Sequence, residues 1–263
     1  MSNITIHKPE DFVKMRSSGK LAAEVLDFIT DYVKPGITTL ELNDLCHDMI
    51  IKNGAIPAPL NYRGFPKSIC TSINHVICHG IPDERKLKDG DIINLDVTVI
   101  VDGWHGDTSR MYLVGNPSVK AKRLIDVTHE AMMLGIEQVK PGAHLGNIGH
   151  AIETYIKKFG YSSVRDYCGH GIGKIFHTEP SVMHFGEAGT GPILETGMFF
   201  TVEPMINAGT YHSRLNPTDG WTVTTKDREL SAQFEHTIAV TETGYEIFTL
   251  SQKGYSKPPY NNI

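Results

Sequence analysis

Residues 92–110, IINLDVTVIVDGWHGDTSR, decide the fold. They predict two β-strands joined at Asp102-Gly103, a dipeptide typical of a two-residue hairpin turn. Each strand carries an aspartate in its interior, Asp96 in the first and Asp107 in the second. Aspartate is depleted in strands because its side chain competes for backbone hydrogen bonds. Two interior aspartates in one hairpin therefore indicate that these side chains serve a function.

The turn also predicts which residues oppose each other. The expected pairs are Val101–Trp104, Thr98–Asp107 and Asp96–Ser109. Side chains alternate along a strand, so one face is polar and the other apolar. The polar face holds Asn94, Asp96, Thr98, Asp107 and Ser109, and the apolar face, expected to pack under helices, holds Ile93, Leu95, Val97, Val99, Trp104 and Tyr112. Asp96 and Asp107 become diagonal neighbours, about 7–8 Å apart at the backbone, and can reach one small ion. The alternative is a solvated face, which antiparallel sheets often have.

Composition describes an ordinary globular chain. Its 263 residues are 40% hydrophobic and 21% charged, enough for a large core. A net charge of -5 gives no global reason to expect binding to nucleic acid or to an anionic membrane. The N-terminus lacks a signal-peptide pattern, no apolar run approaches the ~20 residues of a membrane span, and the four cysteines form no CxxC pair. We therefore expect a cytoplasmic protein with reduced thiols, without membrane or direct nucleic-acid contact, and monomeric by default.

Outside the hairpin the chain alternates helices, loops and short strands. Helices are expected at about 9–33, from the N-cap Thr38 to Gly54, at about 118–139, and from there to Gly160. Strands are expected at about 194–206, 221–225, 233–241 and 246–250. The segment 55–90 is expected to be loop-rich, and 251–263 to be a loosely ordered tail. Parts of this order repeat. VKPG occurs at 33–36 and 139–142, and HGI at 79–81 and 170–172. The repeats predict two copies of one helix-helix-strand unit, and so an α+β fold with pseudo-twofold symmetry.

The repeat extends to the acids. Asp96 lies six residues after Gly90, and Glu203 lies six residues after Gly197. Glu235 likewise interrupts an apolar strand pattern, AQFEHTIAV. Four carboxylates brought together repel each other and require counter-charge, which two divalent cations would supply.

A nitrogen ligand is available at His170, between glycines in CGHGIG, although a histidine in that setting is otherwise a loop residue. Oxygen ligands with one imidazole favour Mn, Fe, Co or Zn over Mg or Ca. Paired metals of this kind activate water for hydrolysis.

Five ordered stretches make the family recognisable. FPKSICTSINHVICHGIPD, DIINLDVTVIVDGWHGDTSRMY, YCGHGIGKIFHTEP, MFFTVEPMINAG and AQFEHTIAVT closely resemble type I methionine aminopeptidases of the bacterial type. The resemblance implies one catalytic domain over residues 1–263 with the pita-bread fold, a central antiparallel β-sheet between two duplicated halves. It also implies a metal-dependent exopeptidase that removes the initiator methionine from nascent polypeptides when the second residue is small.

The resemblance assigns a role to each acid. It implies that Asp107 and Glu235 bridge two metal ions, that Asp96 ligates one ion, and that His170 and Glu203 hold the other.

Catalytic roles follow from the same match. It implies that His79 contacts the scissile amide, that His177 stabilises the developing oxyanion, and that Glu203 accepts the proton of the attacking water. With His79 and His177, the substrate pocket implied by the match consists of Tyr62, Phe65, Cys70, Phe176 and Trp221, whose rings and thiol suit a thioether side chain. His75, Thr178 and Pro59 depart from the bacterial pattern at the pocket rim.

Two other functions remain open at this point. One is a proline-directed peptidase on the same fold; such enzymes usually carry an added N-terminal domain. The other is a non-catalytic binding protein, for example one associated with the ribosome. Retention of all five ligand positions with both outer histidines counts against the binding protein. The expected aminopeptidase would meet nascent chains and could contact the ribosome transiently.

Overall fold

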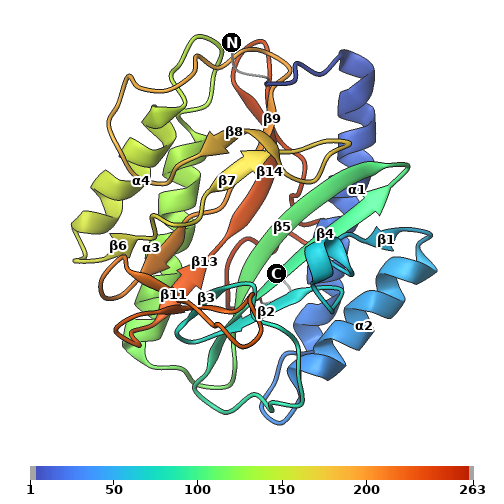
Figure 1. Ribbon diagram of the computed structural model, residues 1–263, viewed down its shortest axis with the longest axis vertical. Helices are drawn as coiled ribbons and strands as arrows, with labels where there is room; N and C mark the ends of the chain where they lie inside the picture. Colours follow the sequence, from blue (N-terminus) through green and yellow to red (C-terminus); the bar gives the residue numbers. More distant parts are fainter. Residues whose placement is uncertain (1–3, 261–263) are drawn as a thin grey trace.

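The computed structural model describes residues 4–260. Two pairs of helices lie on opposite sides of the molecule with the strands between them (Figure 1). The helices are α1 (Pro9–Ile29), α2 (Thr39–Lys52), α3 (Val119–Ile136) and α4 (Gly146–Lys157), with short 3₁₀ helices η1 (Thr30–Tyr32) and η2 (Tyr62–Gly64). All four predicted helices are therefore confirmed. The predicted capping box of α2 is also present: the Glu41 N–H donates to Thr38 Oγ1 at 3.0 Å and the Thr38 N–H to Glu41 Oε2 at 2.7 Å.

The strands form one large sheet and two small ones, all with antiparallel pairs. The strands are β1 (Ile56–Pro57), β2 (Cys70–Ile73), β3 (Val76–Cys78), β4 (Ile92–Val101), β5 (Trp104–Leu113), β6 (Ser162–Ser163), β7 (Gly169–Gly171), β8 (Thr178–Val182), β9 (Phe199–Val202), β10 (Met205–Asn207), β11 (Ser213–Leu215), β12 (Val223–Thr225), β13 (Ser231–Gln233), β14 (Glu235–Val240) and β15 (Tyr245–Ile247). The main sheet runs β1-β4-β5-β14-β9-β7-β8, with β2 beside β4 and β15 beside β14. The described residues contain no helix long and apolar enough to cross a membrane.

The hairpin has the predicted register. Val101 pairs with Trp104, and the register continues through Thr98–Asp107 and Asp96–Ser109. Both turn residues have positive φ, 49° at Asp102 and 80° at Gly103, as a two-residue turn of this hand requires. A slip of one residue would move every aspartate to the opposite face, so this turn fixes the position of both carboxylates.

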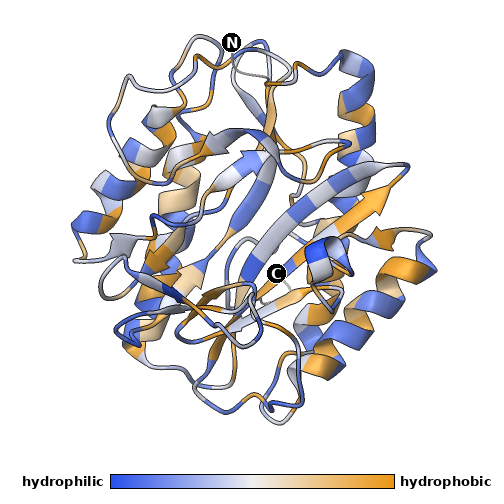
Figure 2. Ribbon diagram, in the orientation of Figure 1, coloured by the Kyte–Doolittle hydropathy of each residue, from blue (hydrophilic) through white to orange (hydrophobic). Residues whose placement is uncertain are grey.

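The apolar face of the hairpin packs under α1 and α2. Its side chains Ile93, Leu95, Val97, Val99 and Tyr112 join one buried cluster with residues of both helices. In Figure 2, β4 is mostly hydrophobic, and α2 carries hydrophobic and hydrophilic residues in alternation around its surface. Helix α1 comes so close to β5 that a Cβ at Gly106 would overlap the backbone of Ser18 and Gly19. A glycine in this strand is therefore explained by close helix–strand contact.

The predicted repeat is visible in the backbone. Gly90 and Gly197 both have φ of 93°. Their N–H groups donate to Val114 O at 2.8 Å, just after β5, and to Val240 O at 2.9 Å, the last residue of β14. These two strands pair directly at Ser109 and Glu235. The pseudo-twofold axis therefore passes between β5 and β14, at the centre of the main sheet.

Several segments differ from expectation. The loop-rich range 55–90 also contains the unpredicted strands β1, β2 and β3, and β6, β7, β8 and β11 were not predicted either; of β13, only Gln233 was. These strands are two to five residues long, too short to show alternation in sequence. The strand expected over 194–206 begins at Phe199 and is interrupted at Glu203-Pro204, because proline cannot donate to a ladder.

The prediction of a loose tail was wrong for residues 251–260; residues 261–263 lie outside the described range. Asp27 on α1 holds this segment: its carboxylate accepts from Ser251 Oγ at 2.7 Å and from the Gln252 N–H at 3.1 Å. The Tyr260 hydroxyl donates to Met111 O at 2.7 Å. Asp27 also pairs with Arg110 Nη1 at 2.5 Å, and both side chains are buried. One buried ion pair thus joins α1, β5 and the tail.

We expect Asp27→Ala to lower the free energy of unfolding by about 3–5 kcal/mol, because it leaves the buried Arg110 guanidinium without its counter-charge. Urea denaturation of both proteins measures the difference. The control is Glu24→Ala, which removes an exposed pair with Lys20 at 3.7 Å and should cost under about 0.5 kcal/mol. A loss below about 1 kcal/mol for Asp27→Ala would contradict this role.

Candidate functional site

A cavity of about 360 Å³ opens where the two halves meet. All twelve residues given a site role in the sequence analysis line it, as does Pro59, whereas His75 and Thr178, expected at the pocket rim, do not. The lining includes Tyr62, Phe65, Cys70, His79, Asp96, Asp107, His170, Phe176, His177, Glu203, Trp221 and Glu235. The structure thus brings together side chains that are up to 173 residues apart, from Tyr62 to Glu235.

The acids come from the central strands of both halves. Asp96 and Asp107 lie on β4 and β5, Glu235 begins β14, and Glu203 directly follows β9. His170 lies on β7, the next strand beyond β9. The pleat directs these side chains to the face opposite the helices.

The polar face of the hairpin is buried. Thr98 is 1% exposed and Asp107 is 3% exposed, so the alternative of a solvated face is wrong. Thr98 Oγ1 donates to Asp107 Oδ1 at 2.7 Å, which orients that carboxylate.

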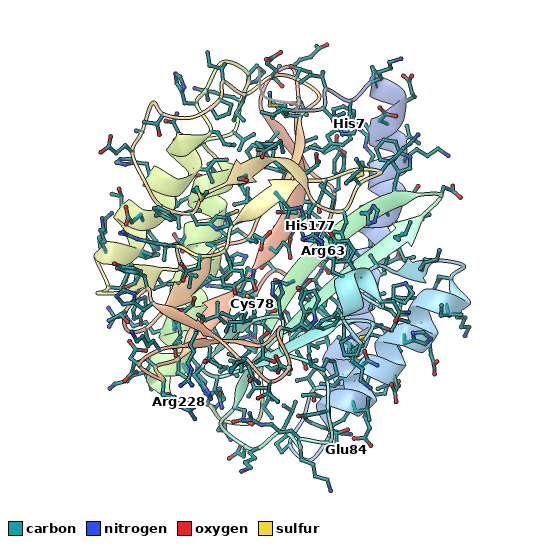
Figure 3. All side chains as sticks on the ribbon, viewed as in Figure 1. His7, Arg63, Cys78, Glu84, His177 and Arg228 are labelled. Carbon is teal, nitrogen blue, oxygen red and sulfur yellow. The ribbon has the colours of Figure 1, made fainter. Side chains whose placement is uncertain are left out.

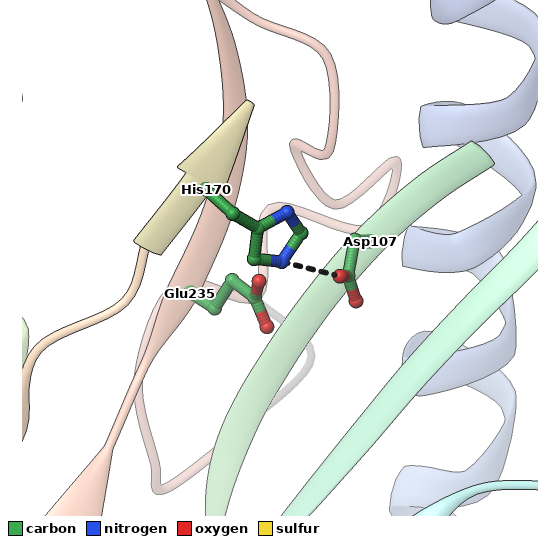
Figure 4. Close-up of side chains that lie close together, drawn as sticks. All are labelled: Asp107, His170 and Glu235. Atoms are coloured by element: carbon green, nitrogen blue, oxygen red, sulfur yellow. Dashed lines mark ion pairs between the residues drawn. The ribbon is translucent and has the colours of Figure 1, made fainter. Parts of the chain in front are cut away.

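Three of these side chains form the tightest group. Ligand atoms of Asp107, His170 and Glu235 lie within 4.8 Å of one another, and the three side chains point toward one another (Figure 4). His170 Nε2 lies 3.5 Å from Asp107 Oδ2 and 3.6 Å from Glu203 Oε1. Asp96 lines the same cavity and acts electrostatically on Glu235.

Burial and mutual repulsion strongly perturb the acids. Burial, followed by the charge of Asp107, raises the pKa of Asp96 and of Glu235 well above the ordinary range. Burial also raises the pKa of Glu203 to about 7. His170 differs: burial lowers its pKa, but its contact with Asp107 and the charge of Glu203 outweigh burial and raise it. Raised pKa values at these acids and at His170 are expected of a site that lacks positive charge of its own.

The donor set fits divalent cations. Arg63 is the one Lys or Arg among the described residues that line the cavity, and it is exposed at the rim. Four carboxylates and an imidazole therefore face one cavity without a buried cationic side chain beside them. Oxygen donors with one imidazole match Mn, Fe, Co or Zn, and cation binding would remove the repulsion.

Aromatic rings form another wall of the cavity. The Tyr62 and Phe176 rings lie 4.9 Å apart, and the Phe65 and Trp221 rings meet edge to face at 5.2 Å. Cys70 pairs with Asp96 across β2 and β4. Burial and the Asp96 charge raise the pKa of the Cys70 thiol well above its usual range. The thiol is therefore neutral, and it adds a polarisable group to the cavity wall.

Two histidines flank the acids. The His79 ring lies edge-on to Tyr167 at 5.7 Å and to Trp221 at 6.1 Å, and burial lowers its pKa to about 4. His177 lies beside Arg63 in Figure 3 and is exposed where the cavity opens. Desolvation by the surrounding cavity walls nevertheless lowers the pKa of His177, and the charge of His170 lowers it further. Both rings are therefore neutral hydrogen-bonding groups.

Sequence reasoning missed the residues that hold Glu203. Thr201 Oγ1 donates to Glu203 Oε1 at 2.8 Å, and Gln233 Nε2 donates to Oε2 at 3.2 Å. The Glu203 N–H donates to His184 Nε2 at 3.0 Å. Thr201 lies on β9, two residues before Glu203. This spacing places both side chains on one face of the strand, so the role of Thr201 could have been predicted. His184 and Gln233 carry no local signal, because they reach Glu203 only through the fold.

Comparison with known proteins agrees with this geometry. The model of metallopeptidase family M24 matches residues 13–242. A methionine aminopeptidase of Rickettsia prowazekii is 66% identical over 98% of this chain and 99% of its own length. A crystal structure of methionine aminopeptidase from Rickettsia prowazekii superposes with a TM-score of 0.93 at 67% identity, covering 94% of this chain and 100% of that one.

The fold is shared more widely than the sequence. A prolidase structure from Pyrococcus horikoshii has a TM-score of 0.73 at 19% identity and shows the fold alone; this chain covers 64% of it. The predicted pita-bread fold and its family are thus confirmed. With its full-length matches at high identity, the chain belongs to metallopeptidase family M24, within the methionine aminopeptidases.

Proposed function

We propose that this chain removes the N-terminal methionine from newly made polypeptides whose second residue is small. The observation that supports this most is a cavity that combines four acids and His170 with an aromatic wall, in a chain 66% identical to a methionine aminopeptidase. We further propose that residues 1–263 act as one catalytic domain, as a monomer in the cytoplasm, and meet nascent chains through transient contact with the ribosome.

Five side chains would hold two divalent cations, chosen from Mn, Fe, Co and Zn. Asp107 and Glu235 would contribute to holding both ions, Asp96 would hold one of them, and His170 and Glu203 would hold the other. When bound, the cations would activate water for attack on the scissile carbonyl and stabilise negative charge on the substrate.

Glu203 would accept the proton of the attacking water. Its carboxylate is already fixed at both oxygens by Thr201 and Gln233. Without a cation, burial raises its pKa to about 7, and a bound cation would favour the ionised form that can accept a proton. The hydrogen bonds therefore direct the carboxylate before substrate arrives.

The two outer histidines would act on the substrate. Tyr62 Oη lies 3.0 Å from His177 Nδ1. If the Tyr62 hydroxyl donates there, the neutral ring carries its proton on Nε2 and can donate to an oxyanion. His79, whose ring lies beside Tyr167 and Trp221, would contact the scissile amide near the cleavage point.

The aromatic wall would recognise methionine. Rings of Tyr62, Phe65, Phe176 and Trp221 together with the Cys70 thiol offer an apolar, polarisable surface that suits a flexible thioether. The proline-directed alternative has less support, because the relatives that match along their whole length are named methionine aminopeptidases.

We expect Asp96→Asn and His170→Ala to abolish methionine release from Met-Ala-Ser, because each removes a ligand. Both variants should stay folded by circular dichroism. The assay uses metal-stripped protein with Mn, Co, Fe or Zn added back, and wild type should be active only after addition. The control is Asp102→Asn in the exposed turn of the same hairpin, which should keep wild-type activity. Wild-type turnover by either ligand variant would refute the assignment.

We expect Phe176→Ala to weaken methionine selectivity, lowering kcat/KM for Met-Ala-Ser by about tenfold to 200-fold, since it removes a ring from the pocket. The preference over Leu-Ala-Ser should shrink. Ile175→Ala is the matched control, because Ile175 is 64% exposed in the same loop and outside the cavity. Unchanged selectivity in Phe176→Ala would place the methionine pocket elsewhere.

We expect His177→Ala to lower kcat by about 10²–10³-fold and to change KM only a few-fold, because an oxyanion donor acts mainly in the transition state. Steady-state kinetics on Met-Ala-Ser separates the two constants. Tyr62→Phe should produce a smaller loss of the same kind. A rise in KM with unchanged kcat would instead assign His177 to ground-state binding.

A further inference from the structure

His184 lies in the loop after β8 and is 1% exposed. The backbone of this loop rests directly on α4: a Cβ at Gly149 would overlap the carbonyl oxygens of Met183 and Phe185. The loop is therefore held against the helix by a contact that only glycine permits. His184 points from it toward the sheet and reaches the backbone of Glu203.

The Glu203 N–H needs such an acceptor. Strand β9 ends at Val202, whose partner on β14 is His236. Glu203 lies one residue beyond this pairing, and Pro204, which follows, has no N–H to continue a ladder. His184 Nε2 accepts the Glu203 N–H at 3.0 Å. A side chain thus replaces the missing strand partner at the residue that enters the metal site.

The bond also sets the state of the ring. A nitrogen that accepts an N–H carries no proton, so the proton of the neutral ring is on Nδ1. His184 Nδ1 is buried and has no hydrogen-bond partner within residues 4–260. Buried polar groups are nearly always hydrogen-bonded, so an unpaired N–H here is a cost to the fold. Packing alone would favour an apolar side chain at this position.

We propose that His184 is a positioning residue that fixes the main chain at Glu203 and thereby aims its carboxylate into the metal site. This inference rests on the proposed function, in which Glu203 binds a cation and accepts a proton. Thr201 and Gln233 hold the two carboxylate oxygens, and His184 holds the backbone. The three contacts leave Glu203 little freedom, although none of them comes from a proposed metal ligand.

The test compares His184→Leu, which removes the acceptor, with His184→Gln, whose Oε1 can accept the same N–H. His184→Met is a second apolar variant of similar volume, used if the leucine variant does not fold. The control is His150→Leu: His150 Nδ1 lies 3.3 Å from Gly186 O, so it touches the same loop from α4 without touching Glu203. Calorimetry measures Mn²⁺ affinity of the metal-stripped proteins, and kinetics on Met-Ala-Ser gives kcat and KM.

We expect His184→Leu to weaken Mn²⁺ binding by about 10–100-fold and to lower kcat by a similar factor, with KM changed only a few-fold and the melting temperature nearly unchanged. His184→Gln should recover most of both losses, and His150→Leu should match wild type. Wild-type Mn²⁺ affinity in a folded His184→Leu, or equal losses in the Leu and Gln variants, would overturn the proposal. If wild type binds Mn²⁺ but releases no methionine, the proposed function fails, while the affinity comparison still decides the role of His184.

Discussion

The structure depends on holding mutually repelling carboxylates in one cavity. Ligand atoms of Asp107 and Glu235 come within 4.8 Å. Two like charges at that separation repel by roughly 3–4 kcal/mol at an effective dielectric constant of about 20. The acids would separate if they stood on mobile loops. Instead, Asp96, Asp107 and Glu235 stand on long strands of the main sheet, and the neighbouring hydrogen bonds of Glu203 hold it at the end of another.

Duplication explains how the fold supplies this rigidity. Each half provides two helices that cover the apolar side of its strands, and the halves join where β5 pairs with β14. The acids gather near that seam because Ser109 and Glu235 face each other across it. On the helix-covered face of the sheet, β5 is held by the close contact of Gly106 with α1 and by the Asp27–Arg110 ion pair. The polar face can therefore carry charge because the opposite face is firmly packed.

How well a feature could be predicted from the sequence depended mainly on how far apart in the sequence its interacting residues lie. The hairpin register was predictable because Asp102-Gly103 fixes it locally, and the repeat located Glu203 from Asp96. The family match supplied His79, His177 and the pocket residues, and all of them line the cavity. The strands β6, β7, β8 and β11 were missed because they are only two to five residues long, too short to show alternation. Asp27 and His184 were missed for a different reason: their partners, in the tail and at Glu203, are apparent only once the chain has folded.

The two outer histidines, His79 and His177, are neutral, and their neutrality affects how the acids can bind cations. A protonated imidazole beside the acids would supply the missing positive charge and compete with a cation for the carboxylates. Burial prevents this by lowering the pKa of His79 to about 4, and the cavity walls and His170 lower that of His177. Each ring keeps one N–H donor and carries no net charge. In the proposed function, the carboxylates would thus remain available to divalent cations, and the histidines could donate to a substrate beside the aromatic wall.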